Sequence, residues 1–286
     1  MAPGGNAKWL DVSAERFPGW VASFARRHGD SGSHGDSASL AAAPAAEAAV
    51  AFTAADGAVA ECHPPFPESF ALPPGLAGPD EPANPGEIAA LLAAHARAPR
   101  TVGVLLVRLG GYAAGVFTGY PPALTDSKVG SRLVHGRSAA GGWSQQRFAR
   151  RREKQANEAL EAAADTAAAV FGRWTTGGVI TARSAPAHHP AGRDTERGGV
   201  SRNRSGAKGA GTGASAAADR GSRLDAVVLG GDKRAVAELR DDPRLAPYLA
   251  LATERFLTVP DPKRAVLEGT PRLFTAVRIR LTEPSM

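Results

Sequence analysis

Apolar and polar residues along this chain follow two different spacings, and each spacing predicts one kind of secondary structure. Short runs of branched and apolar residues predict strands, and two pairs of them are joined by turn residues, Asp56-Gly57 and Gly110-Gly111. The predicted strands are 48–53, 58–62, 101–109, 112–118, 131–134, 224–229 and 274–281. We expect the last strand to be exposed or to lie at a sheet edge, because its apolar residues alternate with polar ones.

Helical spacing is clearest between Gln146 and Phe171, a stretch that contains neither Gly nor Pro. Apolar residues recur there at intervals of three, four and seven, at Ala149, Ala156, Leu160, Ala163, Ala167 and Phe171. Shorter helices are expected at 12–28, with an interruption near Pro18, at 85–98 and at 232–240. Residues 243–269 should form helix and loop.

The order of these elements predicts an α/β fold in two parts. Strands alternate with helices over 99–286, which favours a layered α/β domain, whereas residues 1–98 should form a small α+β N-terminal module. Within the second part, residues 183–222 contain Gly, Ser, Arg and Ala but almost no large apolar side chains. Such a segment buries too little apolar surface to offset its ordering entropy, so we expect a disordered basic insert there.

One face of the long predicted helix is basic near its start. Its cations are spaced at i, i+3, i+4 and i+7, at Arg147, Arg150, Arg151 and Lys154. A helix N-terminus carries partial positive charge and disfavours each nearby cation by about 0.3–1 kcal/mol. Acidic residues gather instead toward the other half, at Glu158, Glu161 and Asp165. This reversal points to an external anion such as phosphate at the helix start, with a merely solvated charged face as the alternative.

The segment that leads into this helix combines three chemical features. Residues 135–152 read HGRSAAGGWSQQRFARRR and join the pair Gly141-Gly142, the carboxamides of Gln145 and Gln146, and a run of guanidinium groups. Glycine reaches backbone conformations closed to other residues, so the loop can approach another molecule's backbone closely. Two interpretations of Trp143 stay open, since its ring could stack on a base or pack back onto the domain.

The same stretch resembles the central-domain motif of the archaeal and eukaryotic class-one translation release factors, HGRGGQSALRFARLRxEK. In this chain HGR is followed by a three-residue insert, SAA, and then by GGWSQQRFARRREK. The matching residues are His135, Gly136, Arg137, Gly141, Gly142, Ser144, Arg147, Phe148, Ala149, Arg150, Arg152, Glu153 and Lys154. The surrounding pattern extends the resemblance to about 100–286 and leaves the N-terminal third uncovered.

The sequence departs from the release-factor motif at one position, and this departure indicates a particular branch of the release factors. Trp143 stands where release factors have their glutamine, and Gln145 and Gln146 follow just downstream. This pattern is similar to the Vms-like release factors of ribosome quality control, in which a G-x-x-Q spacing leads to the functional glutamine. Gly142-Trp143-Ser144-Gln145 satisfies that spacing. A composition rich in Ala, Arg, Gly and Pro favours the actinobacterial branch of that family.

The resemblance implies both a fold and an activity. The fold would be that of a release-factor central domain, with a ribonuclease H-like mixed sheet and a long basic helix. The activity would be hydrolysis of the peptidyl-tRNA ester on stalled large ribosomal subunits, independent of codons. The residues implied in catalysis are Gln145, Gly141, Gly142 and Gln146. Those implied in RNA binding are Arg137, Trp143, Arg147, Arg150, Arg151, Arg152 and Lys154.

The expected partners are therefore the ribosomal RNA of the large subunit and peptidyl-tRNA, with neither a membrane nor DNA. Two other functions fit parts of the sequence. A non-catalytic module that binds the ribosome or tRNA is favoured by Trp143 at the usual glutamine position. A tRNA-end nuclease would have to work without metal, because the predicted strands of the second part offer only Asp225, and two-metal nucleases need several carboxylates.

Composition adds limits to this interpretation. The formal net charge of +6 favours a polyanionic partner. The single cysteine, Cys62, excludes an internal disulfide framework and fits a reducing cytoplasm. No apolar run approaches the roughly 20 residues that span a bilayer. His188-His189 has no acidic or cysteine companions, and 110–115 lacks a dinucleotide-binding glycine pattern, so we expect neither metal nor cofactor.

Overall fold

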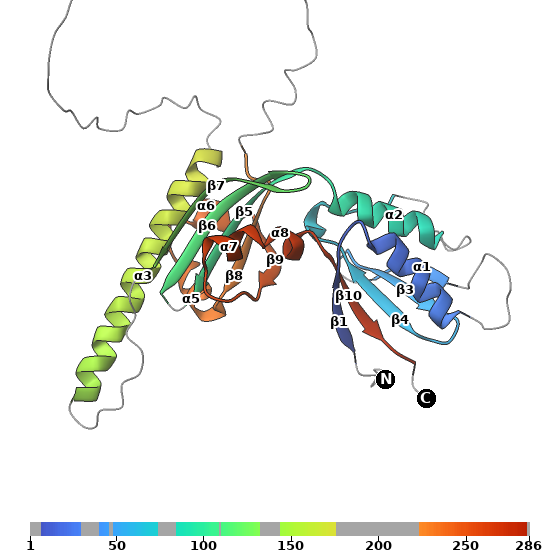
Figure 1. Cartoon of the computed structure of the whole chain (residues 1–286), viewed down its shortest axis with the longest axis horizontal. Helices are drawn as coiled ribbons and strands as arrows, with labels where there is room; N and C mark the ends of the chain where they lie inside the picture. The colour runs from blue at the N-terminus through green and yellow to red at the C-terminus, as the bar shows by residue number, and fades with distance from the viewer. Residues whose placement is uncertain are drawn as a thin grey trace, which may run out of the picture.

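Two five-stranded β-sheets organise the chain in the computed structural model (Figure 1). The structure describes residues 7–29, 40–45, 48–73, 84–108, 110–131, 144–175 and 223–284. For residues 144–152 and 175 it describes the backbone alone. The predicted site residues Arg137, Gly141, Gly142 and Trp143, and the insert expected at 183–222, lie outside the described residues.

The first sheet is antiparallel throughout, with the strand order β1-β10-β4-β3-β2. Its strands are β1 (Lys8–Val12), β2 (Leu40–Pro44), β3 (Val50–Ala54), β4 (Val59–His63) and β10 (Val277–Thr282). Helices α1 (Phe17–His28) and α2 (Pro85–Ala96) cover one face, where their apolar side chains and those of the strands form a single core.

Several elements expected in this part are confirmed. The predicted hairpin is β3–β4, and its turn contains Gly57 at φ 89°, a conformation that glycine adopts at little cost. Helix α2 begins after Asn84, whose side chain accepts a hydrogen bond from the Gly86 backbone N–H at 2.9 Å. The helix expected over 12–28 begins only at Phe17, because Pro18 occupies its first turn instead of interrupting it.

The strand expected at 274–281 is neither exposed as a whole nor at an edge. It is β10, which lies between β1 and β4 in the first sheet and buries Val277, Ile279 and Leu281. Its polar residues alternate with these because they point to the face that α1 and α2 leave open. The expected boundary at residue 98 therefore does not separate the two sheets. Strand β10 follows that boundary in the chain but is an inner strand of the first sheet.

The second sheet is mixed, with the order β7-β6-β5-β8-β9. Its strands are β5 (Arg100–Arg108), β6 (Gly111–Gly119), β7 (Ala123–Ser131), β8 (Ala226–Gly231) and β9 (Ala252–Leu257). Strand β6 is antiparallel to both of its neighbours, whereas β5, β8 and β9 are parallel. Counted in chain order, these strands run 3-2-1-4-5 with the second one reversed, which is the predicted ribonuclease H-like topology.

Helices cover both faces of the second sheet. Helices α3 (Ser144–Thr175), α5 (Lys233–Leu239) and α6 (Ala246–Leu249) pack on one face. The other face is covered by α7 (Arg264–Glu268) and α8 (Pro271–Phe274). This three-layer arrangement confirms the predicted α/β class. The Asp232 side chain caps α5 by accepting from the Arg234 backbone N–H at 2.8 Å.

Two strands of the second sheet differ from the prediction. The third strand, expected at 131–134, is β7 at Ala123–Ser131, and the prediction missed it because its residues are mostly polar. As an edge strand it lies beside β6 alone, so it does not need a continuous apolar sequence. Strand β9 falls within 243–269, where we expected only helix and loop, and half of its residues are polar.

Phe66 connects the two parts of the structure. It follows β4 of the first sheet, yet its ring is 6% exposed and belongs to the core between the second sheet and α8. Its centroid lies 6.3 Å from that of Phe274, and the Arg100 guanidinium lies 4.7 Å from its centre. A second connection is the ion pair of Arg255 in β9 with Asp11 in β1, at 2.7 Å.

We predict that Phe66→Ala lowers the free energy of unfolding by about 3–5 kcal/mol, the usual cost of removing a buried phenyl ring. Urea denaturation followed by circular dichroism measures this change. Phe66→Leu should lose far less, because it refills most of the volume. Equal stability of Phe66→Ala and the unmodified protein would show that the two parts do not share this core.

Candidate functional site

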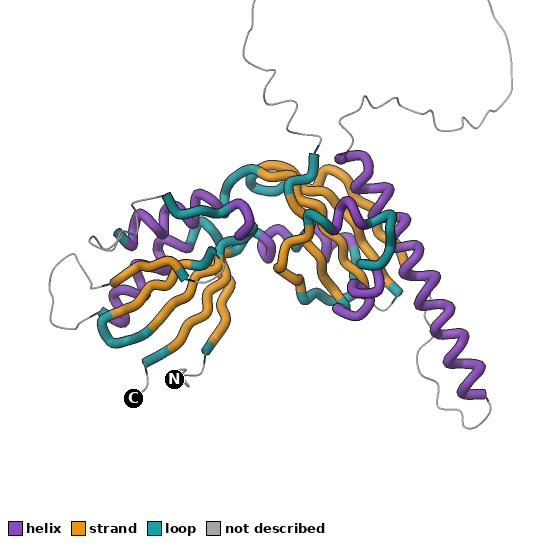
Figure 2. Tube along the Cα trace, turned by 180° about the vertical axis from the view of Figure 1, so that it is seen from behind, coloured by secondary structure: helices purple, strands orange, loops and turns teal. Residues whose placement is uncertain are grey.

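The most distinctive feature of the second part is helix α3, which is 32 residues long and extends beyond the predicted 146–171 at both ends. Its first half projects past the sheet, whereas its second half lies along it (Figures 1 and 2). Among the described side chains of α3, those from Glu153 to Glu158 are exposed or half-buried, and full burial begins at Ala159. At a rise of about 1.5 Å per residue, the part before Ala159 spans about 22 Å.

Small side chains hold the second half of α3 close to the sheet. Ala159, Ala163, Ala164 and Ala167 are between 0% and 5% exposed, and α3 packs mainly on β6. Near the C-terminal end, the Phe171 ring sits over Gly103 of β5, where an added Cβ would lie 3.1 Å from a ring carbon. The alanine side chains thus set a short distance between helix and sheet.

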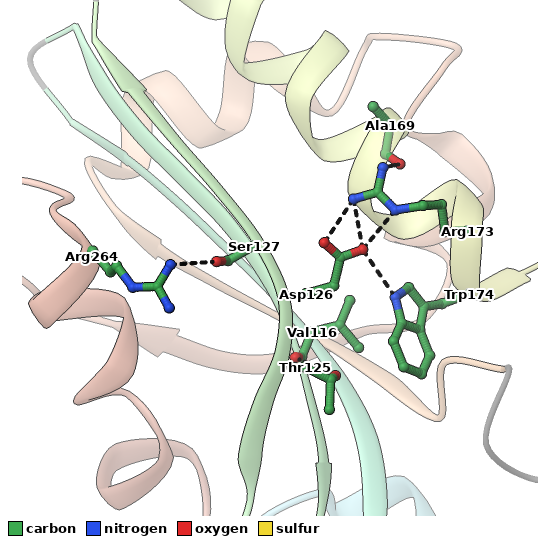
Figure 3. Close-up of polar contacts among 8 residues, drawn as sticks. All are labelled: Val116, Thr125, Asp126, Ser127, Ala169, Arg173, Trp174 and Arg264. Atoms are coloured by element: carbon green, nitrogen blue, oxygen red, sulfur yellow. Dashed lines mark hydrogen bonds and ion pairs between the residues drawn. The ribbon is translucent and has the colours of Figure 1, made fainter. Parts of the chain in front are cut away.

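An ionic contact fixes the C-terminal end of α3 to β7 (Figure 3). Arg173 donates to both carboxylate oxygens of Asp126, at 2.7 and 2.8 Å, and also to the Ala169 carbonyl at 2.7 Å. Trp174 donates its indole N–H to the same carboxylate at 3.4 Å. The two-pronged geometry orients the helix, although partial exposure limits its contribution to stability to about 1 kcal/mol.

A second ionic contact joins α3 to the loop between α5 and α6. Asp165 of α3 pairs with Arg244, and Arg244 also bonds to Asp242 in the loop between α5 and α6. The Arg244 guanidinium lowers the pKa of the Asp242 carboxyl, with a smaller contribution from the Arg244 backbone N–H. The Asp242 carboxylate therefore stays charged at neutral pH, and the pair of Arg244 with Asp165 is a second ionic contact that holds the second half of α3.

The structure places some predicted site residues and leaves others outside its description. Gln145 and Gln146 lie in the first turn of α3, and the arginines of the predicted ridge follow within the next two turns. No acidic residue occupies that first turn, as the sequence indicated. Lys154 is the one ridge residue whose side chain is described, with 79% exposure. Its 3.9 Å pair with Glu158 is a weak surface contact that leaves the ammonium accessible.

The segment 132–143 follows β7 in the chain, and the last residue of β7, Ser131, lies at one end of the second sheet. There Ser131 pairs with Gly111, next to Arg108 of β5. A cavity of about 1020 Å³ lies at the other end, lined by residues such as Arg100, Gly119 and Arg223. Gln145 and Gln146, in the first turn of the projecting α3, are therefore not part of this cavity.

Two ionisable groups of that cavity, Arg100 and Asp225, have structural partners. Arg100 donates to the His95 carbonyl at 2.8 Å and to the Ala98 carbonyl at 3.1 Å. The Asp225 carboxylate accepts the Thr101 backbone N–H at 2.7 Å and so fixes the start of β5 beside β8. Within the described ranges, no cluster of three or more His, Cys, Asp or Glu could hold a metal ion. None of the described helices is long and apolar enough to cross a membrane.

Sequence reasoning missed the residues that orient α3. Asp126 lies in a polar edge strand, and its partner Arg173 lies 47 residues later in the chain. The one local signal was a cation in the last helical turn, where it favours the helix dipole. Cys62 is fully buried, and burial raises the pKa of its thiol.

The second sheet and the helix that projects from it form an α/β domain with a ribonuclease H-like strand order. The chain belongs to the Actinobacteria/chloroflexi VLRF1 release factor family, whose family model matches residues 100–280. No curated protein matches the chain. A crystal structure of the archaeal translation termination factor aRF1 aligns with 96% of this chain and 68% of its own, at 12% identity and a TM-score of 0.34. The family indicates a role in peptide release or ribosome rescue, in contact with the ribosome.

We predict that Ala167→Leu costs about 1–3 kcal/mol of unfolding free energy, because the larger side chain cannot fit between α3 and the sheet. The exposed Ala169 provides a matched control in the same helix. Ala169→Leu should change stability by less than about 0.5 kcal/mol. Urea titrations of both variants test this, and similar costs at the two positions would contradict close packing of α3.

Proposed function

We propose that this protein is a codon-independent peptidyl-tRNA hydrolase that releases nascent chains from stalled large ribosomal subunits in the cytoplasm. One observation carries the proposal. In a member of the VLRF1 release factor family, the glycine- and glutamine-bearing segment leads directly into the first turn of a helix that projects about 22 Å from its domain. A projection of this kind suits a reaction that takes place inside another particle.

The chemistry requires little from the protein itself. The ester between peptide and tRNA is already activated, so catalysis can rest on positioning a water molecule and stabilising the developing oxyanion. The carboxamide of Gln145 offers both a donor and an acceptor for that water. Gly141 and Gly142 would let the backbone approach the ester, with Gln146 as the neighbouring alternative. Ribosomal RNA would complete the active site.

The basic ridge of α3 would position this tip on RNA. Cations near the start of the helix oppose its dipole, and phosphate groups would remove that conflict. The ridge residues are Arg147, Arg150, Arg151 and Lys154, and Arg137, Trp143 and Arg152 would add contacts on either side. Contacts to phosphate orient a protein without reading sequence, which fits release at many different stalls.

A non-catalytic rescue module that binds the same cleft is the second candidate. Trp143 at the position of the release-factor glutamine is the observation that favours it. A metal-independent nuclease acting on the tRNA end has less support, because Asp225 is bonded to the Thr101 backbone. Purified protein added to large subunits that carry peptidyl-tRNA separates the three, since free peptide with intact tRNA indicates the hydrolase.

We predict that Gln145→Ala lowers the rate of peptide release at least about 100-fold, because it removes the group that positions water. Binding to large subunits, measured by co-sedimentation, should stay nearly unchanged. Gln146→Ala is the matched control, with the same side chain removed one residue later, and it should retain most of the activity. Loss of release in Gln146→Ala with none in Gln145→Ala would reverse the assignment.

We also predict that reversing Arg147, Arg150 and Arg151 to Glu abolishes both release and subunit binding at near-physiological salt. At lower salt, where binding can still be measured, a plot of log affinity against log salt concentration should be shallower by about three, because three phosphate contacts are lost. Deletion of 185–220 should only slow association, because that segment would offer diffuse attraction. If the deletion abolishes release while the triple reversal is tolerated, the basic ridge of α3 does not position the protein on RNA.

A further inference from the structure

The first sheet has an open face whose side chains the proposed release activity does not use. Helices α1 and α2 lie together on one side of this sheet, in both views of the molecule (Figures 1 and 2). On the other side, β1, β10 and β4 present Trp9, Arg278 and His63. Trp9 is 47% exposed, the larger exposure of the two large apolar side chains that the described residues leave at the surface.

Three planar groups meet on this face. The Arg278 guanidinium carbon lies 4.4 Å from the centre of the Trp9 ring. The centroid of His63 lies 5.5 Å from that of Trp9, and the two rings are inclined by 46°. All three side chains start from paired strands, with Asp11 opposite Arg278 and Arg278 opposite His63 in the register. The backbone therefore holds the group in place, and the exposed side of the indole is free to accept another planar group.

Charges on the face favour an anionic partner. Asp11 is paired with Arg255 at 2.7 Å, and Glu61 is paired with Arg280 at 3.4 Å, so both carboxylates are neutralised. Arg278 has no carboxylate within ion-pair distance in the described part of the chain. Burial lowers the pKa of Arg255, the Asp11 carboxylate raises it, and the charge of Arg278 lowers it.

The neighbouring strands leave room beside the Trp9 group. On the same face, β3 and β2 carry only small side chains, at Ala51, Thr53, Ala41 and Ala43. A protein-binding surface usually has a contiguous apolar centre, and this face lacks one among its described residues. An antiparallel sheet face with an exposed indole ring and a guanidinium group that has no carboxylate partner is instead suited to stacking of unpaired bases.

We propose that the open face of the first sheet binds single-stranded RNA, with a base stacked on Trp9 and a phosphate held by Arg278. The second sheet lies between α3 and the first sheet in both views (Figures 1 and 2). The protein would therefore contact RNA at two separate places, one at the projecting helix and one at the first sheet. The second contact does not depend on the hydrolase activity proposed above.

The test measures RNA binding by the full chain with its basic ridge removed as a background. The triple reversal of Arg147, Arg150 and Arg151 to Glu supplies that background, so that α3 does not dominate binding. The probe is a fluorescein-labelled oligouridylate of about 12 nucleotides, a length in the range of single-stranded binding sites, followed by fluorescence anisotropy. In this background, Trp9→Ala should lower the affinity about tenfold, and Trp9→Phe should retain most of it.

Arg278→Ala tests the phosphate contact. It should lower the affinity several-fold and reduce the salt slope by about one. Arg234→Ala is the matched control, since Arg234 is also an exposed arginine, with 90% side-chain exposure, but lies on α5 of the second part. Circular dichroism confirms that each variant is folded. The proposal is overturned if Trp9→Ala and Arg278→Ala bind the oligouridylate as tightly as Arg234→Ala does, whether or not the protein releases peptides.

Discussion

Close packing of the alanine-rich half of α3 against β6 is the contact on which the rest of the second part depends. Small side chains bring the helix near the sheet along its second half, and the contacts of Arg173 and Arg244 fix its direction. Because that half is immobilised, the first half can extend without support from the sheet. The position of Gln145 in space thus follows from packing between Ala159 and Phe171, later in the same helix.

The two sheets are joined by chain connections as well as by contacts. The chain leaves the first sheet after β4, forms the whole second part and returns as β10 to the middle of the first sheet. Phe66 lies in the core of the second part although it belongs to the segment that follows the first. The ion pair of Arg255 with Asp11 adds a polar link between β9 and β1. We therefore regard the first part as a companion of the release-factor domain and not as an independent module.

Sequence patterns predicted the elements whose residues have one clear burial pattern. Strands β5, β6 and β8 are almost wholly buried, and α3 shows helical spacing over many turns. The pattern failed for β7 and β9, because edge strands tolerate polar residues, and for β10, because alternation does not say which sheet a strand joins. The motif around Gln145 could be recognised because its residues resemble the release-factor motif. The bond between Asp126 and Arg173 could not, since it joins distant segments that only the fold brings together.

The central place of β10 also affects how the protein is made. Strands β1 and β4 can pair with β10 only after residues 277–282 have been synthesised, so the first sheet stays open while more than two hundred later residues leave the ribosome. Over that time the apolar faces of α1 and α2 lack part of their core, which makes the nascent chain prone to misassembly. A protein that we propose acts on interrupted synthesis would itself be sensitive to interruption before its last strand.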